Sequence, residues 1–211
     1  PQHGKIQNYR MIFDKSSYNV KLFGMNQRQH KILEAAVTVF SRYGVRKATM
    51  GDIAEMVGIS RQTLYANYAN KDEILTAAIR CLCDQTIAGV EQAWEQTGSI
   101  SEKLDIFVEC AVVRHFEQIR QMQGSNDLLT GCGKAGFTEL QLAETRKVGM
   151  LAGLFAARRE ALAQNGSSPT DLAEFFYNSS SSFKYTARDK AHLELLLATL
   201  KRSTMVMLGE S

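Results

Sequence analysis

Three consecutive polar side chains, Arg61, Gln62 and Thr63, could form directional hydrogen bonds to the edges of DNA bases. Arginine can pair in a bidentate fork with guanine O6 and N7, and glutamine can pair similarly with adenine. Ser60 precedes them as a helix cap, and Leu64 is the one plainly apolar residue that follows. Side chains at the start of a recognition helix enter the major groove. The stretch therefore predicts a helix that reads duplex DNA.

Three short helices would hold these side chains in place. An apolar stripe with helical spacing begins at Arg28 and ends near Gly44, a residue suited to a helix end. The segment Thr49–Asp52 has the form of a capping box, and Gly58 breaks the short helix that it opens. Ser60 then caps the third helix. These helices are short and closely spaced, and the third begins with polar residues. This arrangement predicts a helix-turn-helix.

The segment from Thr49 to Leu75 resembles the signature of the TetR family of bacterial repressors. The matching positions are Thr49, Ile53, Ala54, Val57, Gly58, Ile59, Ser60, Thr63, Leu64, Tyr65, Tyr68, Lys71 and Leu75. The resemblance implies that Arg61, Gln62 and Thr63 face bases and that Thr49, Tyr65 and Lys71 clamp phosphates. The expected DNA-binding residues are Thr49, Ser60, Arg61, Gln62, Thr63, Tyr65, Asn67, Tyr68 and Lys71.

Three positions depart from the family pattern. Asn67 stands where the family usually has histidine or an aromatic residue, and Ala69 stands where proline is common. Gly51 is a poor helix former inside the second short helix. Tyr65 and Tyr68 also have an alternative role, in which both pack mainly between helices instead of contacting DNA.

The rest of the chain predicts helices alone. We expect one helix from Lys71 to near Gly98, one opened by a capping box at Ser99–Glu102, and a broken stretch at 124–136. A long helix should follow from Phe137 to Ala163. One further helix should begin at Ser168, and a last helix should end at Gly209. No segment shows the alternation of a strand. The fold is therefore expected to be all-α.

Two domains and an amino-terminal segment are expected. Residues 25–71 would form the helix-turn-helix DNA-binding domain, and residues 72–211 a helical ligand-binding and dimerisation domain. Residues 1–24 show no sustained period and would be a leader, an artificial addition or a short basic arm that can contact DNA. The resemblance further implies a homodimer that binds a palindromic operator and is released by a small-molecule effector bound in the carboxyl-terminal domain.

Side chains of the larger domain provide candidates for both tasks. Each aromatic candidate for the effector pocket could equally be ordinary core. The ligand candidates are Trp94, Phe107, Cys110, Arg114, His115, Phe116, Met122, Phe137 and Phe155. The last two helices could pack with those of a partner as a four-helix bundle. The candidates for that interface are Leu172, Phe175, Phe176, Ser179, Phe183, Leu193, Leu196, Leu197 and Leu200.

Charge and cysteine usage limit the class of protein. Residues 1–71 carry 11 lysine and arginine residues against 4 acidic ones, whereas residues 72–211 carry 14 against 18. A basic first third suggests a polyanionic partner at one end. Four cysteines in 211 residues do not make a disulfide framework and read as free thiols. No apolar run reaches the length of a membrane span, so a cytoplasmic protein without a membrane partner is expected.

Two other classes of function compete with a DNA-binding regulator. A helical enzyme is suggested by 131–136, which matches the G-x-G-x-x-G fingerprint, but that motif needs a preceding strand and a parallel sheet. No nucleophile motif or metal-ligand spacing of histidines is present, so we expect no catalytic residue, metal or cofactor. A helical protein-interaction module without DNA binding would leave the polar cluster at 61–63 unexplained.

Overall fold

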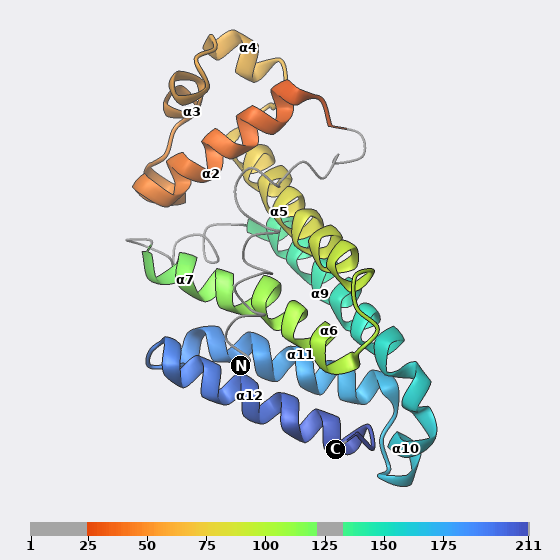
Figure 1. The fold of residues 1–211 in the computed structure, drawn as a ribbon. Coiled ribbons are helices and arrows are strands. Elements are labelled where there is room, and N and C mark those ends of the chain that lie inside the picture. Colours follow the sequence, from red (N-terminus) through yellow and green to blue (C-terminus); the bar gives the residue numbers. More distant parts are fainter. Residues whose placement is uncertain (1–24, 122–132, 211) are drawn as a thin grey trace. The chain divides into compact units, whose positions relative to one another are not determined.

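The computed structural model describes residues 25–121 and 133–210 of the chain, and every regular element in these ranges is a helix (Figure 1). The all-α prediction is confirmed. The elements in chain order are α2 (Gln27–Lys47), α3 (Met50–Val57), α4 (Arg61–Tyr65), α5 (Lys71–Trp94), α6 (Ile100–Val108), the π-helical turn η1 (Glu109–Val113), α7 (Arg114–Gln121), α9 (Gly133–Phe155), the 3₁₀ turn η2 (Ala156–Arg158), α10 (Arg159–Gln164), α11 (Pro169–Thr186) and α12 (Lys190–Met207).

The chain divides into two compact units, each with its own core. The described residues of the first unit, which we call the head, are 25–85, 118–121 and 133–143. Those of the second, which we call the body, are 86–117 and 144–210. Both α5 and α9 therefore contribute residues to each unit.

The head is built around one apolar cluster from α2, α3, α4 and the first part of α5. Its largest fully buried side chains are Phe40, Ile32, Ile53, Leu64, Ile74 and Leu75. The cluster extends along α5 to Cys81, beyond the domain boundary that the sequence predicts at Lys71. Burying this shared cluster is what lets helices as short as α3 and α4 stay folded, since such short helices are unstable alone.

The first helix of the head ends in a distorted turn. Gly44 lies within the bounds of α2 but has φ 75°, so the regular helix is interrupted at the glycine that the sequence marks as its end. The chain continues in one further turn to Lys47, where the Ala48 N–H donates to the Gly44 carbonyl at 3.1 Å. Asn26 and Gln29 form a complete capping box at the other end of α2.

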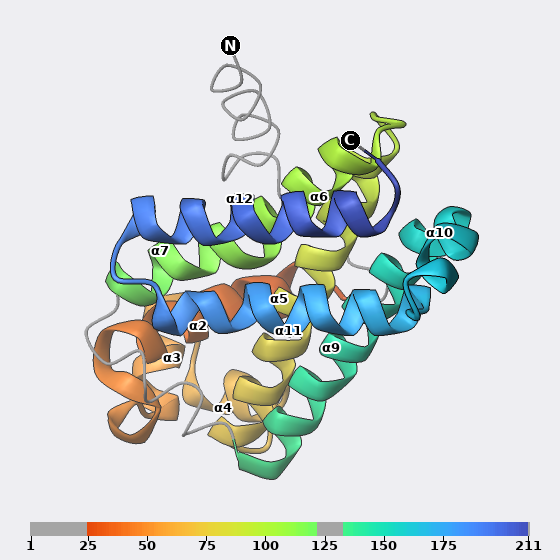
Figure 2. The same cartoon turned by 90° about the horizontal axis from the view of Figure 1, so that it is seen from below.

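The body packs α6, η1 and α7 against α11 and α12. Figures 1 and 2 show α11 and α12 side by side, with α12 running along α6. Phe176 of α11 makes edge-to-face contacts with Phe107 and Phe155, with ring centroids 6.2 and 6.5 Å apart. Lys201 of α12 is 2.6 Å from the Asp105 carboxylate of α6. Together these contacts make the centre of the body a closely packed core.

The helix predicted from Ser99 contains one wide turn. In η1 the Arg114 N–H donates to the Glu109 carbonyl, five residues back in place of the usual four. The wide turn places four consecutive residues, 110–113, among the buried ones. The start of α6 is capped as predicted, because the Ser99 side chain accepts a hydrogen bond from the Glu102 N–H. The Glu102 carboxylate, however, accepts from the Thr97 hydroxyl. The predicted capping box is therefore only half formed.

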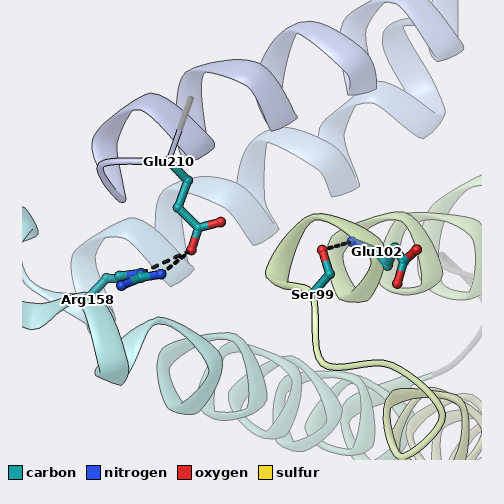
Figure 3. Close-up of polar contacts among 4 residues, drawn as sticks. All are labelled: Ser99, Glu102, Arg158 and Glu210. Carbon is teal, nitrogen blue, oxygen red and sulfur yellow. Dashed lines mark hydrogen bonds and ion pairs between the residues drawn. The ribbon is translucent and has the colours of Figure 1, made fainter.

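The helix predicted from Phe137 to Ala163 is not continuous. It begins earlier, at Gly133, and is interrupted by η2 after Phe155, where Arg158 has the non-helical angles φ −112° and ψ 21°. The Arg158 side chain donates hydrogen bonds from its Nε and Nη2 to one carboxylate oxygen of Glu210, at 3.0 and 2.7 Å (Figure 3). By contrast, the predicted start of α11 is confirmed, with Pro169 in its first turn and a complete capping box between Ser168 and Asp171.

The body buries much of the surface that the sequence offers for dimerisation. Five of the nine candidates, Leu172, Phe176, Leu193, Leu197 and Leu200, lie in the core of their own chain. Phe175 is 54% exposed, and Ser179, Phe183 and Leu196 are half-buried. Other residues of α11 and α12 are exposed, and from them we define a set called the outer stripe. It consists of Phe175, Asn178 and Ser182 of α11, and Leu195, Thr199, Arg202 and Val206 of α12.

Three other features bear on the expected classes of protein. Cys81, Cys83 and Cys110 are free thiols, and Cys132 lies outside the described residues. Gly133 and Gly136 of the glycine fingerprint lie in α9, and the described ranges contain no strand that could precede a dinucleotide site. Gly131 lies outside these ranges. Within the described helices, none combines the length and apolar character needed to cross a membrane.

Candidate nucleic-acid interface

A tight turn at Gly58 joins α3 to α4. Gly58 has φ 77°, a left-handed conformation that glycine adopts without steric penalty. Its N–H donates to the carbonyls of Ala54 and Glu55, and the Ile59 N–H donates to Ala54 at 3.0 Å. These bonds satisfy the last carbonyls of α3 and send the chain directly into α4. The predicted helix-turn-helix thus follows from local chemistry.

Helix α4 has five residues and is held by one cap and one buried anchor. The Ser60 hydroxyl accepts from the Thr63 N–H at 3.0 Å, and the Leu64 side chain is completely buried in the head. Arg61 and Gln62, in the first turn, are exposed, and Tyr65 is 53% exposed. The helix is therefore anchored by one buried side chain and presents Arg61, Gln62 and Tyr65 outward.

Two of the residues predicted to contact DNA already form hydrogen bonds within or next to α4. The Thr63 hydroxyl lies 2.9 Å from the Ser60 hydroxyl, and Thr63 is half-buried. The Asn67 amide donates to the Thr63 carbonyl at 2.8 Å, which satisfies a carbonyl group near the end of the helix. Asn67 thus has a structural role in the free protein, and its DNA contact stays a prediction.

Thr49, the residue that caps the start of α3, is exposed. The Thr49 N–H and hydroxyl both donate to one Asp52 carboxylate oxygen at 2.8 Å, and the Asp52 N–H donates back to the Thr49 hydroxyl at 3.2 Å. The predicted capping box is complete. These hydrogen bonds from Thr49, and more weakly the charge of Arg61, hold the pKa of Asp52 below its usual value. A phosphate contact by Thr49 would add to this structural role.

Tyr68 and Lys71 lie deeper than the sequence alone indicates. Tyr68 is 8% exposed and belongs to the core of the head, and this burial raises the pKa of its phenol. The Lys71 ammonium donates to the carbonyls of Val45, Arg46 and Ala48. The packing alternative is therefore favoured for Tyr68, and Lys71 gains a structural role that no local sequence pattern signals.

Most of the candidate effector residues that the structure describes are packed in or against the core of the body. Phe107, Phe116 and Phe155 are core residues of the body, as is Cys110, whose thiol pKa is raised to about 11 by burial. The Trp94 indole donates to the Lys103 carbonyl at 2.9 Å. Phe137, on α9, is 56% exposed, and Met122 lies outside the described residues. The core alternative therefore describes most of the aromatic candidates.

The two polar candidates lie together at the start of α7. The Arg114 Nε is 3.8 Å from a Glu109 carboxylate oxygen. The Nδ1 atom of His115 is buried and has no hydrogen-bond partner within the described residues. Burial, followed by the positive charges of Lys184 and Lys147, lowers the pKa of His115 to about 3. A backbone hydrogen bond with Ala111 opposes part of this shift, but the imidazole is still neutral at physiological pH.

Two open hollows in the body lie elsewhere. One, of about 450 Å³, lies between the end of α9 and the start of α11, and Arg159, Ser168 and Pro169 line it. The other, of about 480 Å³, is lined by Arg158, Glu210 and Ser99 among others. Figure 3 draws these three residues. Neither hollow includes a residue that the sequence analysis proposes for effector binding.

Comparisons with known proteins agree with this geometry. The family model for bacterial regulatory proteins of the tetR family matches residues 32–78, which contain the whole helix-turn-helix. The transcriptional activator FasR of Mycolicibacterium smegmatis is 30% identical over 107 residues, covering 50% of this chain and 49% of that protein. The transcriptional repressor KstR2 of Mycobacterium tuberculosis is 27% identical over 127 residues, covering 59% of this chain and 64% of that protein. The chain thus spans less than two thirds of either relative.

A solved structure extends the likeness of fold over most of the chain. The transcriptional regulator of the TetR/AcrR family from Thermobifida fusca superimposes with a TM-score of 0.61 at 18% identity, covering 87% of this chain and 97% of that one. The fold and the exposed α4 define a helix-turn-helix protein. Residues 32–78 match the DNA-binding segment of the tetR family of bacterial regulatory proteins. The relatives named here are transcriptional regulators and not enzymes.

Proposed function

We propose that this protein binds duplex DNA through α4 and regulates transcription, as a repressor that binds a palindromic operator. The observation that carries the proposal is the exposure of Arg61 and Gln62 at the start of a helix anchored by the buried Leu64. A helix that uses only one residue for its core leaves the others free to enter a groove. The membership of residues 32–78 in a family of bacterial regulators supports this function and a cytoplasmic location.

The proposal includes a homodimer, because one five-residue helix makes too few contacts for tight binding. The outer stripe supports an interface that places two copies of α11 and α12 in a four-helix bundle. It offers small side chains for close approach at Asn178, Ser182 and Thr199, with Phe175 and Leu195 as apolar contacts. The two heads would then contact successive turns of the duplex.

Release by a small molecule completes the proposal. An effector would bind the body and favour a dimer whose heads are misspaced for the operator. The unpartnered Nδ1 of His115 supports the start of α7 as the place where a polar group of the effector is recognised. Because the surrounding aromatic residues are packed as core, binding there would require them to move apart.

The test is selection of preferred duplexes from a random library by the full chain, followed by titration of the selected duplex at several salt concentrations. A two-fold symmetric sequence and a steep fall of affinity with salt are expected, because phosphate contacts release counterions. Arg61→Ala should weaken binding by about 1–3 kcal/mol, whereas Arg146→Ala removes an exposed charge from α9 and should not. Enrichment of no sequence, or a slope near zero, would refute the proposal.

A further inference from the structure

Gly51 and Arg61, on different helices of the head, occupy adjoining space. A Cβ atom built on Gly51 would lie 2.6 Å from Nη2 of Arg61 and 3.1 Å from both its Cζ and its Nε. The guanidinium group, which starts from the first turn of α4, therefore covers the place on α3 where residue 51 would carry a side chain. Arg61 is otherwise exposed, so this contact fixes its position from one side only.

Backbone conformation does not explain a glycine at this position. Gly51 lies in the first turn of α3 and is not one of the glycines with positive φ, which among the described residues are Gly44, Gly58, Gly133, Gly166 and Gly209. Glycine is among the poorest helix formers, so its presence lowers the stability of a helix that has only eight residues. A residue with a side chain at position 51 would fill the space that the Arg61 guanidinium now occupies.

The charge environment supports the same position for Arg61. Asp52, the next residue of α3, has its pKa lowered partly by the positive charge of Arg61. An arginine side chain has many rotamers in solution, and confining it before binding reduces the entropy that is lost on contact with a base. A guanidinium resting on α3 would thus approach the groove from a defined place and with its bidentate donors already oriented.

We propose that Gly51 is a positioning residue that seats the guanidinium of Arg61 on α3 and thereby determines which base pair Arg61 reads. This inference rests on the proposed DNA-binding function and assigns part of its specificity to a residue with no side chain. It also predicts an unusual pairing of effects. Replacing Gly51 with alanine forces only the flexible end of Arg61 to move, so the variant should be more stable and should read DNA less selectively.

The experiment compares the wild type with Gly51→Ala, Arg61→Ala and the double variant. Each base pair of the selected half-site is changed in turn, and binding to every duplex is measured by fluorescence anisotropy. The base pair at which Arg61→Ala loses its preference identifies the contact of Arg61. Gly51→Ala should lose preference at that same base pair, by roughly tenfold, and nowhere else. The double variant should match Arg61→Ala alone, because the effect of Gly51 passes through Arg61.

The matched control is Gly149→Ala in the middle of α9, where an added Cβ meets nothing within 4 Å. It should raise the melting temperature as Gly51→Ala does and leave base preference unchanged. A second measurement needs no DNA: nuclear Overhauser contacts between the Arg61 side chain and the Gly51 Hα atoms are expected in the free wild type.

Four results would overturn the inference. The first is that Gly51→Ala has the same base preferences as the wild type, and the second is that Gly51→Ala changes those preferences as much in the Arg61→Ala background as in the wild type. The third is that Arg61→Ala changes no base preference. The fourth is that the nuclear Overhauser contacts are absent. In each case the wild type still selects a duplex, so the DNA-binding function stands. A wild type that selects no duplex refutes both that function and the role of Gly51.

Discussion

The Lys71 ammonium lies 2.6 Å from the carbonyl oxygen of Val45. It also lies 3.0 Å from the Ala48 carbonyl and 3.3 Å from that of Arg46, so one cation serves three carbonyls at the end of α2. These carbonyls follow the break at Gly44 and carry the partial negative charge of a helix end. Lys71 thereby ties the start of α5 to the end of α2.

We therefore expect Lys71→Met to lower the free energy of unfolding by about 1–3 kcal/mol, because a charged donor to two half-buried carbonyls and one exposed carbonyl is lost. Urea denaturation of the free protein measures this change. Lys47→Met, at an exposed position in the last turn of α2, is the control and should change stability by less than about 0.5 kcal/mol. Equal stability of the two variants would contradict the structural role.

The phosphate contact that the family resemblance implies for Lys71 has a separate readout. If Lys71 also contacts a phosphate, the slope of log affinity against log salt should fall by about one in Lys71→Met. Affinity for every duplex should then weaken uniformly, since phosphate contacts carry no sequence information. An unchanged slope with reduced stability would assign Lys71 to the fold alone.

The capping box of α3 should make stability depend on pH in the acidic range. Hydrogen bonds from Thr49 lower the folded-state pKa of Asp52 below its unfolded value near 3.8. The stabilisation is therefore complete above the unfolded pKa and is lost as pH falls through the folded pKa. Asp52→Asn should be less stable than the wild type at about pH 7, and the difference should narrow as the pH is lowered towards about 2.5.

Asp171 provides the matched case, because hydrogen bonds from Ser168 lower its pKa in the same way at the start of α11. Asp171→Asn should show the same convergence with the wild type on acidification. Chemical denaturation at both pH values measures the two effects. A stability difference that stays constant with pH in both variants would show that neither carboxylate is stabilised by its cap.

The two tyrosines near α4 should separate stability from binding. Tyr68 is 8% exposed in the core of the head, so Tyr68→Ala should cost about 3 kcal/mol or more. Tyr65 is 53% exposed, so Tyr65→Ala should stay within about 0.5 kcal/mol of the wild type while weakening duplex binding. Thermal unfolding and anisotropy titration together test the pair. A large loss of stability in Tyr65→Ala would show that Tyr65 acts mainly by packing between helices.

The outer stripe should control the oligomeric state. Phe175→Glu or Leu195→Glu would bury an unpaired carboxylate at the proposed interface and should raise the dimer dissociation constant by roughly 100-fold or more. Sedimentation velocity over a range of concentrations measures this change. Leu142→Glu, which adds the same charge at a 55% exposed position of α9, should leave the dimer intact. A wild type that remains monomeric would refute the dimer.

Local chemistry made much of the head, and the start of α11 in the body, predictable. The caps at Thr49, Ser60 and Ser168 and the turn at Gly58 depend on residues within a few positions of one another, so their spacing is visible in the sequence. The buried Leu64 is similarly marked by being the apolar residue in a polar helix. These features place the helix-turn-helix and its exposed start before any tertiary contact is known.

The contacts that escaped prediction join residues from separate helices. Lys71 bonds to carbonyls more than twenty positions away, and such a pairing has no periodic pattern. The break after Phe155 falls in a sequence rich in good helix formers, where the Arg158–Glu210 bonds are among the tertiary contacts present. In α11 and α12, apolar spacing marks a buried face but does not say whether the same chain or a partner covers it.

The wide turn at Glu109–Val113 takes up one residue more than an ordinary helical turn. Deleting one residue from it would restore ordinary spacing and leave the residues of α7 facing nearly as they do now. Inserting one residue in the regular part of α6 would instead rotate everything that follows by about 100° around the helix axis, and Phe116 would leave the core although no side chain had been altered. The segment should therefore accept the loss of one residue at the wide turn but not a gain in α6, unlike the loop at 165–167, where an insertion only lengthens a connection.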